Sequence, residues 1–398
     1  MLIAVAYFQI SNPRLLIPDF PRSMVALALV TGIALLVDRR RVVLPRVPWA
    51  SALYLGLCAV SVLWSITPAD TVRMTLLYAW IALFAGICAA QADTGTLLRG
   101  FAWGGVLVVL ATLISLLVDP IRFGHGLLYS GTALGVHGHR GIVAYSVVLA
   151  LTAALMRRPE TKRSRAEAYL TIAVNVVGVA IAPAATGQVG AACVLVGWLT
   201  ILFLRRLRGR SLALGWATVA AALVLGGIAA LLNRGRLLAL LGKSPDFTGR
   251  FGIWEIVVGT SLQAPLTGYG FGAVWRYSWW PLDGSDVLRK MWSERTGAYA
   301  GQPFFHGHNL LIDVLPQLGL LGATAAFLVL GLLAVRGISG LTSDSPAPAW
   351  GLLIFLALVT MGLAEPLLSI PLGWFCATVA AAAARAGRVR EFRAEPIQ

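Results

Sequence analysis

Apolar residues occupy the chain in long uninterrupted runs, and these runs decide the fold class. A bilayer core about 30 Å thick requires roughly 20 apolar residues per helix. We place candidate runs at 2–20, 22–38, 49–65, 73–91, 99–118, 141–157, 168–184, 187–204, 212–232, 308–335, 349–369 and 371–385. The first run contains Asn12-Pro13-Arg14 and is expected to be broken or re-entrant. The pattern therefore predicts an all-α polytopic membrane protein with about twelve transmembrane helices.

The composition agrees with a membrane protein. Hydrophobic residues make up 58% of the chain and charged residues 12%, which is far too apolar for a soluble domain of this length. The net charge of +15 comes from short basic clusters between apolar runs, so we expect membrane lipids and no nucleic acid as partners. The four cysteines lie inside apolar runs without a CxxC pair, and they predict neither a disulfide nor a metal site.

The distribution of Lys and Arg predicts the orientation. One set of connections holds 19 of the 32 basic residues, whereas the short connections of the other set hold five. The remaining eight lie in one long connection, which the positive-inside rule weighs lightly. The protein is therefore expected in a bacterial inner membrane, with both termini on the cytoplasmic side. We divide the chain into an N-terminal bundle of about nine spans (1–232), a long periplasmic loop (233–307), C-terminal transmembrane helices (308–385) and a cytoplasmic tail (386–398).

The long connection is the one substantial extracytoplasmic element in this topology. Long loops in compact bundles are usually functional or disordered. This one contains Trp254, Trp275, Trp279, Trp280 and Trp292, together with several Tyr and Phe residues. Such aromatic content is typical of a structured loop on the membrane interface.

All five histidines lie on the predicted outer side: His125, His137, His139, His306 and His308. They can be ordinary interfacial residues, or they can have one of two functions. His-Gly-His occurs twice and offers four imidazoles to zinc or copper. That spacing is not a usual chelating one and no Asp/Glu-rich motif accompanies it, so we expect no metal and no cofactor.

The second function is acid–base chemistry beside a polyanion. Histidine exchanges protons near neutral pH, and arginine binds phosphate oxygens through two parallel hydrogen bonds. This combination suits a lipid-linked diphosphate. Composition alone does not separate it from ordinary binding of anionic lipid headgroups by arginine.

Three stretches carry a family resemblance. From His308 the chain reads His-Asn, nine residues, then Gly319-Leu-Leu-Gly322, which resembles the H-[NSQ]-x9-G-x-x-[GTY] signature of the O-antigen ligase family at every defined position. "TGRFGIWEIVVGTSLQAPLTGYGFG", residues 248–272, resembles the family's Gly-Arg, Trp, Pro and Gly-x-Gly progression, and "VLWSITPADTVR", residues 62–73, its Trp-Ser…Pro segment. The resemblance covers most of the chain, and only 248–322 is specific.

The resemblance implies a fold of the C-type glycosyltransferase kind. It implies transfer of a glycan from an undecaprenyl-diphosphate-linked donor on the periplasmic face, without a metal. In O-antigen ligases the acceptor is the lipid A core, and in the related O-antigen and exopolysaccharide polymerases it is another lipid-linked repeat. The motif spacing favours the ligase.

The resemblance also assigns roles to residues. His308 matches the histidine proposed as the base on the acceptor hydroxyl, and Arg250 the arginine proposed to hold the diphosphate. Asn309 is expected to cap a helix, and Gly319 and Gly322 to allow close helix approach. We expect the helix to begin at His308, where the positive end of the helix dipole favours the neutral, proton-accepting imidazole.

Further candidates complete the predicted site. His306 is expected to orient the loop or the acceptor, and Arg276 to bind substrate. Glu365 lies near the outer end of the eleventh run, where a carboxylate usually has a partner, so we expect it to pair with an active-site arginine or histidine. The chain reads "ATGQVG" at 185–190 where relatives often have Ser-Arg, and Arg140 is our candidate for the missing diphosphate-binding arginine.

Two further sequence features argue against a nucleotide-binding loop and against a transporter. "GYGFG", residues 268–272, follows no strand, which favours a tight interfacial turn over a nucleotide loop. A transporter or lipid flippase would require charges or broken helices at mid-membrane in two repeated halves. The sequence has no internal repeat and almost no charge inside its apolar runs.

Overall fold

The structure, a computed structural model, describes residues 1–11, 47–118, 140–182, 184–233, 235–236, 250–275, 285–297 and 306–394. Over these ranges the chain is helical, with no strand. Every predicted apolar run that falls within the described residues contains a helix. The run 22–38 and the second half of 2–20 lie outside them.

The helices follow one another along the chain as an all-α series. They are α1 (Leu2–Ser11), α3 (Trp49–Val60), α4 (Pro68–Gln91), α5 (Thr94–Val118), α7 (Arg140–Met156), α8 (Lys162–Ile181), α9 (Ala185–Leu204), α10 (Gly209–Leu232), α12 (Arg250–Ser261), α13 (Ser285–Thr296), α14 (Leu310–Ser339), α15 (Ala347–Gly362) and α16 (Pro371–Ala394), with short 3₁₀ turns at Ser61–Leu63 and Leu367–Ser369. The described part of the long connection expected at 233–307 therefore includes helices α12 and α13, and α16 continues into the range expected as a tail.

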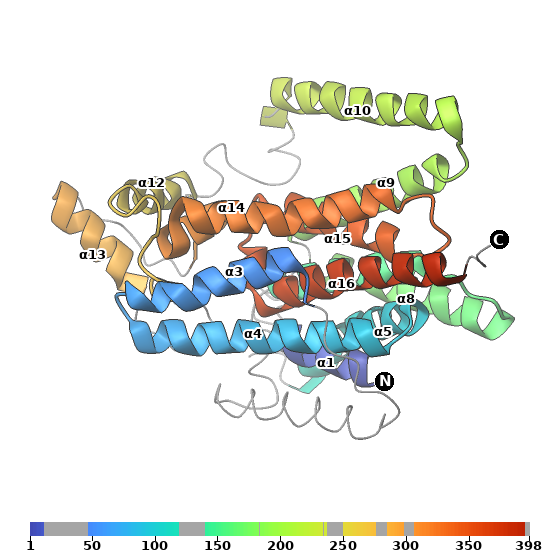
Figure 1. The fold of residues 1–398 in the computed structure, drawn as a ribbon, viewed down its shortest axis with the longest axis horizontal. Helices are drawn as coiled ribbons and strands as arrows, with labels where there is room; N and C mark the ends of the chain where they lie inside the picture. Colours follow the sequence, from blue (N-terminus) through green and yellow to red (C-terminus); the bar gives the residue numbers. More distant parts are fainter. Residues whose placement is uncertain are drawn as a thin grey trace.

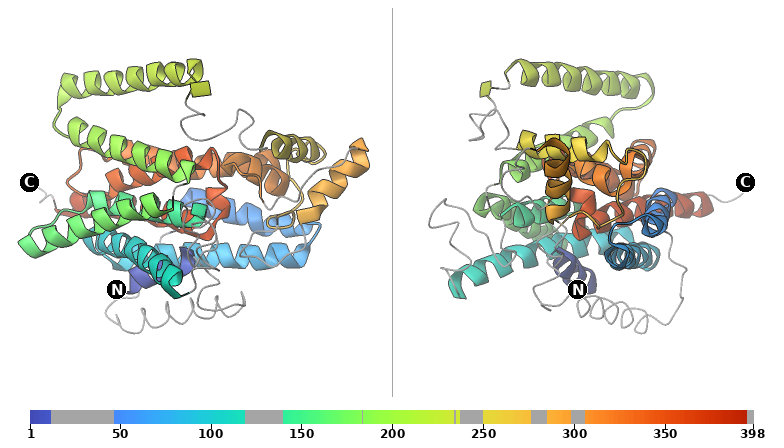
Figure 2. Two further views of the ribbon diagram at one scale, coloured as in Figure 1. Left: turned by 180° about the vertical axis from the view of Figure 1, so that it is seen from behind. Right: turned by 90° about the vertical axis from the view of Figure 1, so that its left-hand side faces the viewer.

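Most helices run along the long axis of the molecule (Figure 1). Helices α12 and α13 lie at one end of this bundle, which we call the loop end, and the C-terminus lies at the other, which we call the tail end (Figures 1 and 2). Helix α10 lies along one side of the bundle and packs against α9. The connection 205–208 between α9 and α10, one of the predicted cytoplasmic segments, lies at the tail end.

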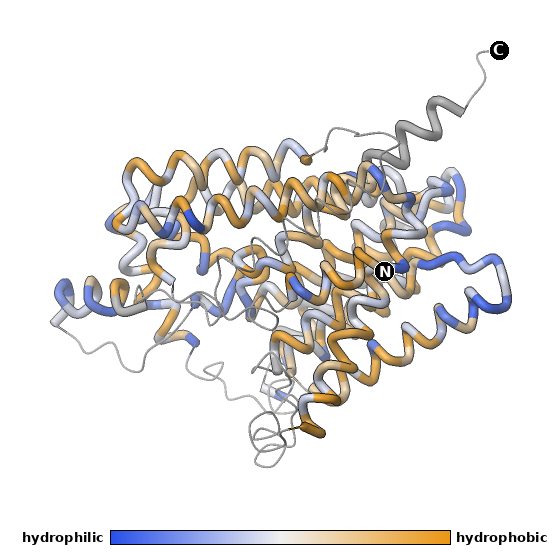
Figure 3. Tube along the Cα trace, turned by 90° about the horizontal axis from the view of Figure 1, so that it is seen from below, coloured by the Kyte–Doolittle hydropathy of each residue, from blue (hydrophilic) through white to orange (hydrophobic). Residues whose placement is uncertain are grey.

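Length and composition indicate a multi-pass membrane protein. Five described helices, α4, α5, α8, α9 and α14, are long and apolar enough to cross a membrane. Shorter apolar helices accompany them, and polar residues gather mainly at the two ends of the bundle (Figure 3). The count of twelve spans and the orientation of the termini stay predictions.

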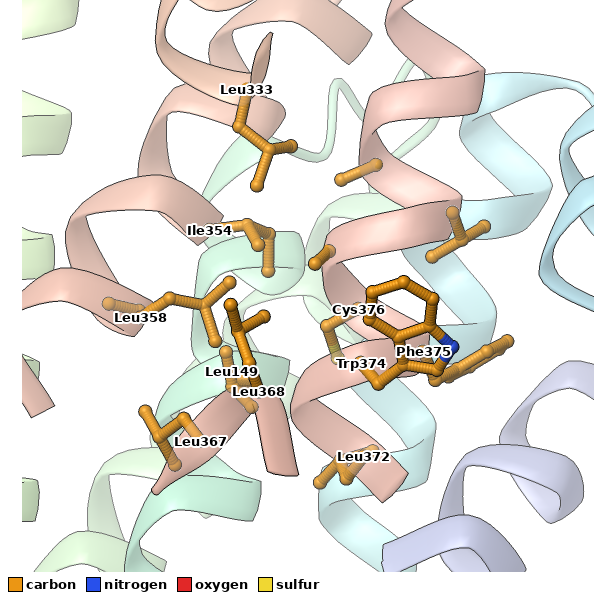
Figure 4. Close-up of a cluster of buried hydrophobic side chains, with 14 of the residues drawn as sticks. Leu149, Leu333, Ile354, Leu358, Leu367, Leu368, Leu372, Trp374, Phe375 and Cys376 are labelled. Atoms are coloured by element: carbon orange, nitrogen blue, oxygen red, sulfur yellow. The ribbon is translucent and has the colours of Figure 1, made fainter. Parts of the chain in front are cut away.

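The core lies where α14, α15, α16 and α7 meet. Leu333, Ile354, Leu358, Leu368 and Phe375 are among its buried side chains (Figure 4). The buried tryptophans there have partners for their indole N–H groups: Trp350 donates to Thr152 Oγ1 at 3.1 Å and Trp374 to the Tyr78 carbonyl at 3.0 Å. Both buried indole N–H groups are therefore hydrogen-bonded, as buried polar groups in proteins usually are.

Helix α14 is broken near its start. Pro316 lies inside the helix, and Gly319 has φ 61° and ψ −156°, a conformation essentially confined to glycine. In an unbroken helix the N–H groups of Leu320 and Leu321 would donate to the carbonyls of Pro316 and Gln317. Pro316 and Gln317 are buried, and buried backbone groups require other partners because water does not reach them.

Residues 262–275, which follow α12 and which we call the insertion loop, supply those partners. The loop replaces each lost helical bond by two bonds across the break. Tyr269 N donates to Pro316 O (2.9 Å), Gly270 N to Gln317 O (2.9 Å), Leu320 N to Pro265 O (2.8 Å) and Leu321 N to Leu266 O (3.2 Å). A Cβ on Gly319 would overlap the Leu266 carbonyl carbon, so the approach itself requires glycine.

The connection between α3 and α4 holds the other side of the insertion loop. Trp64 Nε1 donates to Thr267 O at 3.1 Å, and Ile66 N donates to Tyr269 O at 3.0 Å. The ring of Phe271 contacts Tyr54 and Tyr78 edge-on, with ring centroids 6.1 and 5.1 Å apart. The three stretches that carry the family resemblance therefore meet in one place.

The GYGFG turn is part of this contact. Gly268, Gly270 and Gly272 all have positive φ, which confirms the predicted tight turn. The turn is buried against α14 and the α3–α4 connection.

We expect Gly319→Ala to lower the free energy of unfolding by about 3 kcal/mol. Alanine is strained in this backbone conformation, which costs about 1–3 kcal/mol, and its Cβ would also overlap the insertion loop. Gly331→Ala, in the same helix with open space around its Cα, is the matched control and should be neutral or slightly stabilising. Thermal midpoints of both purified variants, read from tryptophan fluorescence in one detergent, check this. Equal midpoints would contradict the role given to the break.

Candidate functional site

Three segments meet at the loop end: the first residue of α12, residues 306–309 before α14, and residues 363–366 after α15. They bring together Arg250, His306, His308, Asn309 and Glu365, which the sequence analysis singled out. Hydrogen bonds and the ion pair of Arg250 with Glu365 join the segments.

Arg250 binds the connection after α15. Its Nη1 donates to the Ala364 carbonyl at 2.7 Å, and its Nη2 lies 3.6 Å from Glu365 Oε1. The two side chains are only 18% and 10% exposed, so the pair is largely shielded from solvent screening. A guanidinium has five N–H donors, and these contacts leave others for a ligand.

The two histidines of the motif lie against each other. Their ring centroids are 3.9 Å apart, and the His308 backbone N–H donates to His306 Nδ1 at 3.2 Å. One nitrogen of each imidazole and one oxygen of Glu365 all lie within 4.8 Å of one another. The Glu365 carboxylate is therefore shared between Arg250 on one side and the histidine pair on the other, as expected for its pairing.

Backbone strain marks His308. Its φ of 47° is the one positive value among non-glycine residues in the described ranges. Strained conformations of this kind persist only where the surrounding structure holds them, and they cluster at functional sites. The hydrogen bonds of Gly307, the preceding residue, hold His308 in this conformation.

Gly307 is fixed from both sides. Its N–H donates to Asp313 Oδ1 at 2.8 Å, and its carbonyl accepts a hydrogen bond from Trp254 Nε1 at 2.8 Å. Asp313 is fully buried. The turn that presents His306 and His308 is therefore held by α14 on one side and α12 on the other.

Asp313 also connects the site to the break in α14. The Asp313 carbonyl accepts hydrogen bonds from Trp275 Nε1 at 2.8 Å and from Gln317 Nε2 at 2.9 Å. Gln317 Oε1 in turn accepts from Gly272 N at 2.8 Å. A continuous set of buried hydrogen bonds thus runs from the insertion loop to the histidine turn.

Asn309 caps α14, and this confirms the predicted cap. Its Oδ1 accepts from Leu311 N at 2.9 Å and from Ile312 N at 3.1 Å, while its Nδ2 donates to the Leu363 carbonyl at 3.1 Å. The helix begins at Leu310, so the expectation that it begins at His308 is wrong by two residues. The amide caps one helix and at the same time binds the end of another.

The other predicted site residues either have side chains outside the described residues or are glycines of α14. Arg140 is the first residue of α7, and its side chain lies outside the described residues, as do Arg276, His125, His137 and His139. Gly319 lies at the helix break, where its close neighbour is the backbone of the insertion loop in place of the helix we expected. Gly322 is buried one turn later in α14.

Two buried residues near the site were missed. Asp313 stands in an apolar run, where a carboxylate is costly and usually has a task, so its position was an available signal. Tyr145 of α7 is also buried, near Glu365. Nothing in its local sequence distinguished it from an ordinary core tyrosine.

A metal could be considered for His306, His308 and Glu365, since His₂Glu is a known zinc ligand set. One ligand atom of each of these three residues lies within 4.8 Å of the other two. A cation there would also share Glu365 with the guanidinium of Arg250. The positive charge beside the carboxylate is thus already supplied by the chain.

Comparison with known proteins adds one relative. No protein-family model matches the chain. The chain is similar to the exopolysaccharide production protein ExoQ of Rhizobium meliloti (strain 1021), with 27% identity over 295 residues. The similarity covers 71% of this chain and 63% of the relative, so less than two thirds of the relative's length is matched.

We expect Asn309→Ala to lower stability by about 1 kcal/mol through loss of the helix cap. Asn309→Asp keeps the cap acceptor and loses the donor to Leu363 O, so it should recover most of the stability lost in the alanine variant. Thermal unfolding of the three proteins in one detergent measures the order. An aspartate variant no more stable than the alanine variant would show that the cap is not the main contribution of this side chain.

Proposed function

We propose that this chain is a membrane glycosyltransferase of polysaccharide biosynthesis. It transfers a glycan from an undecaprenyl-diphosphate-linked donor to a sugar hydroxyl on the outer face of the bacterial cytoplasmic membrane. The observation that carries the proposal is the convergence of His308 and Arg250 on one carboxylate, Glu365, within a sequence that resembles the O-antigen ligase family. The similarity to an exopolysaccharide production protein supports the same class of process.

His308 acts as the general base in this proposal. Its imidazole takes the proton of the acceptor hydroxyl while the hydroxyl oxygen attacks the anomeric carbon. A positioned base contributes about 10²–10⁴ in rate. Glu365 beside the imidazoles stabilises the imidazolium that forms, as a carboxylate does in other His-carboxylate pairs.

Arg250 stabilises the leaving group. As the bond between the anomeric carbon and the diphosphate oxygen breaks, the diphosphate gains negative charge. The N–H groups of Arg250 that are not used on Ala364 and Glu365 can donate to its oxygens. Fixed donors of this kind are worth about 3 kcal/mol each. The displacement inverts the anomeric carbon, undecaprenyl diphosphate departs, and the imidazolium returns its proton to solvent.

The acceptor separates two versions of the function. The motif spacing favours an O-antigen ligase, whose acceptor is the lipid A core. The name of the relative refers to a polysaccharide made for export, which favours a polymerase that joins lipid-linked repeats. Both versions use the same residues and the same bond changes.

Reconstitution tests the function and separates the versions. Purified protein in liposomes receives an undecaprenyl-diphosphate oligosaccharide, with or without lipid A core, and products are resolved by size. Transfer only in the presence of lipid A core identifies a ligase, whereas a ladder on the isoprenoid lipid identifies a polymerase. Absence of transfer with either acceptor, from protein that remains folded, would overturn the proposal.

We expect His308→Ala and Arg250→Ala each to abolish product while leaving the thermal midpoint within a few degrees. The reason is that each removes a group required in the transition state. Arg73→Ala is the matched control, because Arg73 is an exposed arginine of α4 paired with Asp70. Near-normal turnover in either site variant would remove the role assigned to that residue.

We also expect transfer to be unchanged by excess EDTA and inhibited by added Zn²⁺. Zinc would occupy His306, His308 and Glu365 and so remove the base. Rates measured at fixed donor concentration, with Mg²⁺ as a control cation, check both parts. Loss of activity in EDTA with recovery on zinc addition would instead indicate a metal-dependent reaction.

A further inference from the structure

A second candidate site lies at the tail end, remote from the site just described. Helix α4 starts near the loop end and finishes at Gln91, so the start of α5 lies at the opposite end, with the end of α7 and the start of α8. A recess of about 300 Å³ lies between these three helix ends. Its lining includes Arg99, Arg157, Arg158, Thr161 and Glu167.

Positive charge exceeds negative charge around the recess. Arg99, Arg157 and Arg158 face Glu160 and Glu167 in the lining, which leaves one net positive charge. Lys162, Arg163 and Arg165, in the first turn of α8, add three positive charges, and Asp93, beside the lining residue Gly95, removes one, which gives a net charge of +3. An anion is therefore attracted to this place.

One of the two acidic residues of the lining, Glu167, is already engaged. A single oxygen of Glu167, Oε1, lies 2.7 Å from Arg99 Nε, 3.2 Å from Arg157 Nη2 and 2.6 Å from Trp103 Nε1. One carboxylate thus serves two guanidinium groups. The pairing fixes both arginines without neutralising both of them.

Arg99 retains donors for a ligand. Its side chain is 63% exposed and binds Glu167 through Nε; within the described residues its two terminal nitrogens donate to no protein acceptor. The start of α8, capped by Thr161, forms another part of the wall and adds the positive end of a helix dipole. Guanidinium and helix N-terminus together are the groups that bind phosphate in proteins.

The outer face of α8 indicates that the phosphate belongs to a lipid. Residues seven apart lie on one face of a helix. Tyr169 and Val176 follow Lys162 at this spacing, and Leu170 and Val177 follow Arg163. These four apolar side chains are 45–66% exposed. Acyl chains packed along this face would place a headgroup at the basic first turn, beside the recess.

We propose that this recess binds the phosphate headgroup of an anionic phospholipid. Its volume is at the low end of the range of about 300–1,000 Å³ for small-molecule sites, which suits a phosphoglycerol headgroup and not an oligosaccharide repeat. By the distribution of basic residues this end is the cytoplasmic one, where basic pockets between transmembrane helices bind such headgroups. The proposal is independent of the glycosyltransferase function.

Lipid binding to the purified full chain tests the proposal. Native mass spectrometry and thermal shifts are recorded with phosphatidylglycerol, phosphatidylcholine and inorganic phosphate. We expect phosphatidylglycerol to bind at least tenfold more tightly than phosphatidylcholine, and Arg99→Gln to remove about tenfold of that affinity. Arg73→Gln is the matched control, because Arg73 is also an exposed arginine, 64% against 63%, and is also paired with a carboxylate. It should leave the affinity unchanged.

Each other outcome overturns the proposal. Equal binding of the two lipids, or equal loss in the Arg73 and Arg99 variants, would show only general attraction to basic protein. Inorganic phosphate that competes as well as the lipid would show an anion site and not a lipid site. If Arg99→Gln does not fold, because it loses the ion pair to Glu167, Arg158→Gln tests the same recess; Arg158 is exposed and donates to the Asp344 carbonyl, outside the Glu167 pairing.

Discussion

The structure depends on an exchange of backbone hydrogen bonds inside the membrane protein. Helix α14 gives up its own bonds at Pro316 and Gln317, and the insertion loop supplies four in their place. Water does not replace these bonds at buried residues, where each backbone group left without a hydrogen bond costs about 1–3 kcal/mol. The loop and the helix are therefore stable only together, and Gly319 is the residue that lets their backbones meet.

This exchange determines the geometry of the candidate site. Gln317, at the break, binds the insertion loop through its carbonyl and its side chain, and the Asp313 carbonyl through its amide. Asp313 fixes Gly307, and Gly307 fixes the strained conformation of His308. Positioned groups with little freedom are what acid–base and electrostatic catalysis require. This hydrogen-bonded support holds the turn of His306 and His308 at the end of the bundle.

The sequence predicted the helices of the apolar runs, because such runs leave the chain few alternatives, but not helices α12 and α13 in the connection expected as a loop. It also predicted the cap at Asn309 and a partner for Glu365, since each follows from a local cost that one side chain must offset. It did not predict the start of α14, the conformation of His308 or the burial of Tyr145 near Glu365. These depend on which distant segments pack together, and neither periodicity nor spacing contains that information. Asp313 could have been predicted as a site residue, because a carboxylate in an apolar run costs free energy at any position.

The pairing of the insertion loop with the broken helix has a consequence for exchange of parts between related chains. Residues 61–66, 262–275 and 313–322 are far apart in the sequence and form one hydrogen-bonded unit. The backbone hydrogen bonds between these segments are available to any sequence, whereas the hydrogen bonds of Trp64 and Gln317 and the close approaches at the glycines depend on residue identity. A hybrid protein that received only the loop from a relative would keep the backbone bonds but lose the fit of these side chains, unless the other two segments moved with it.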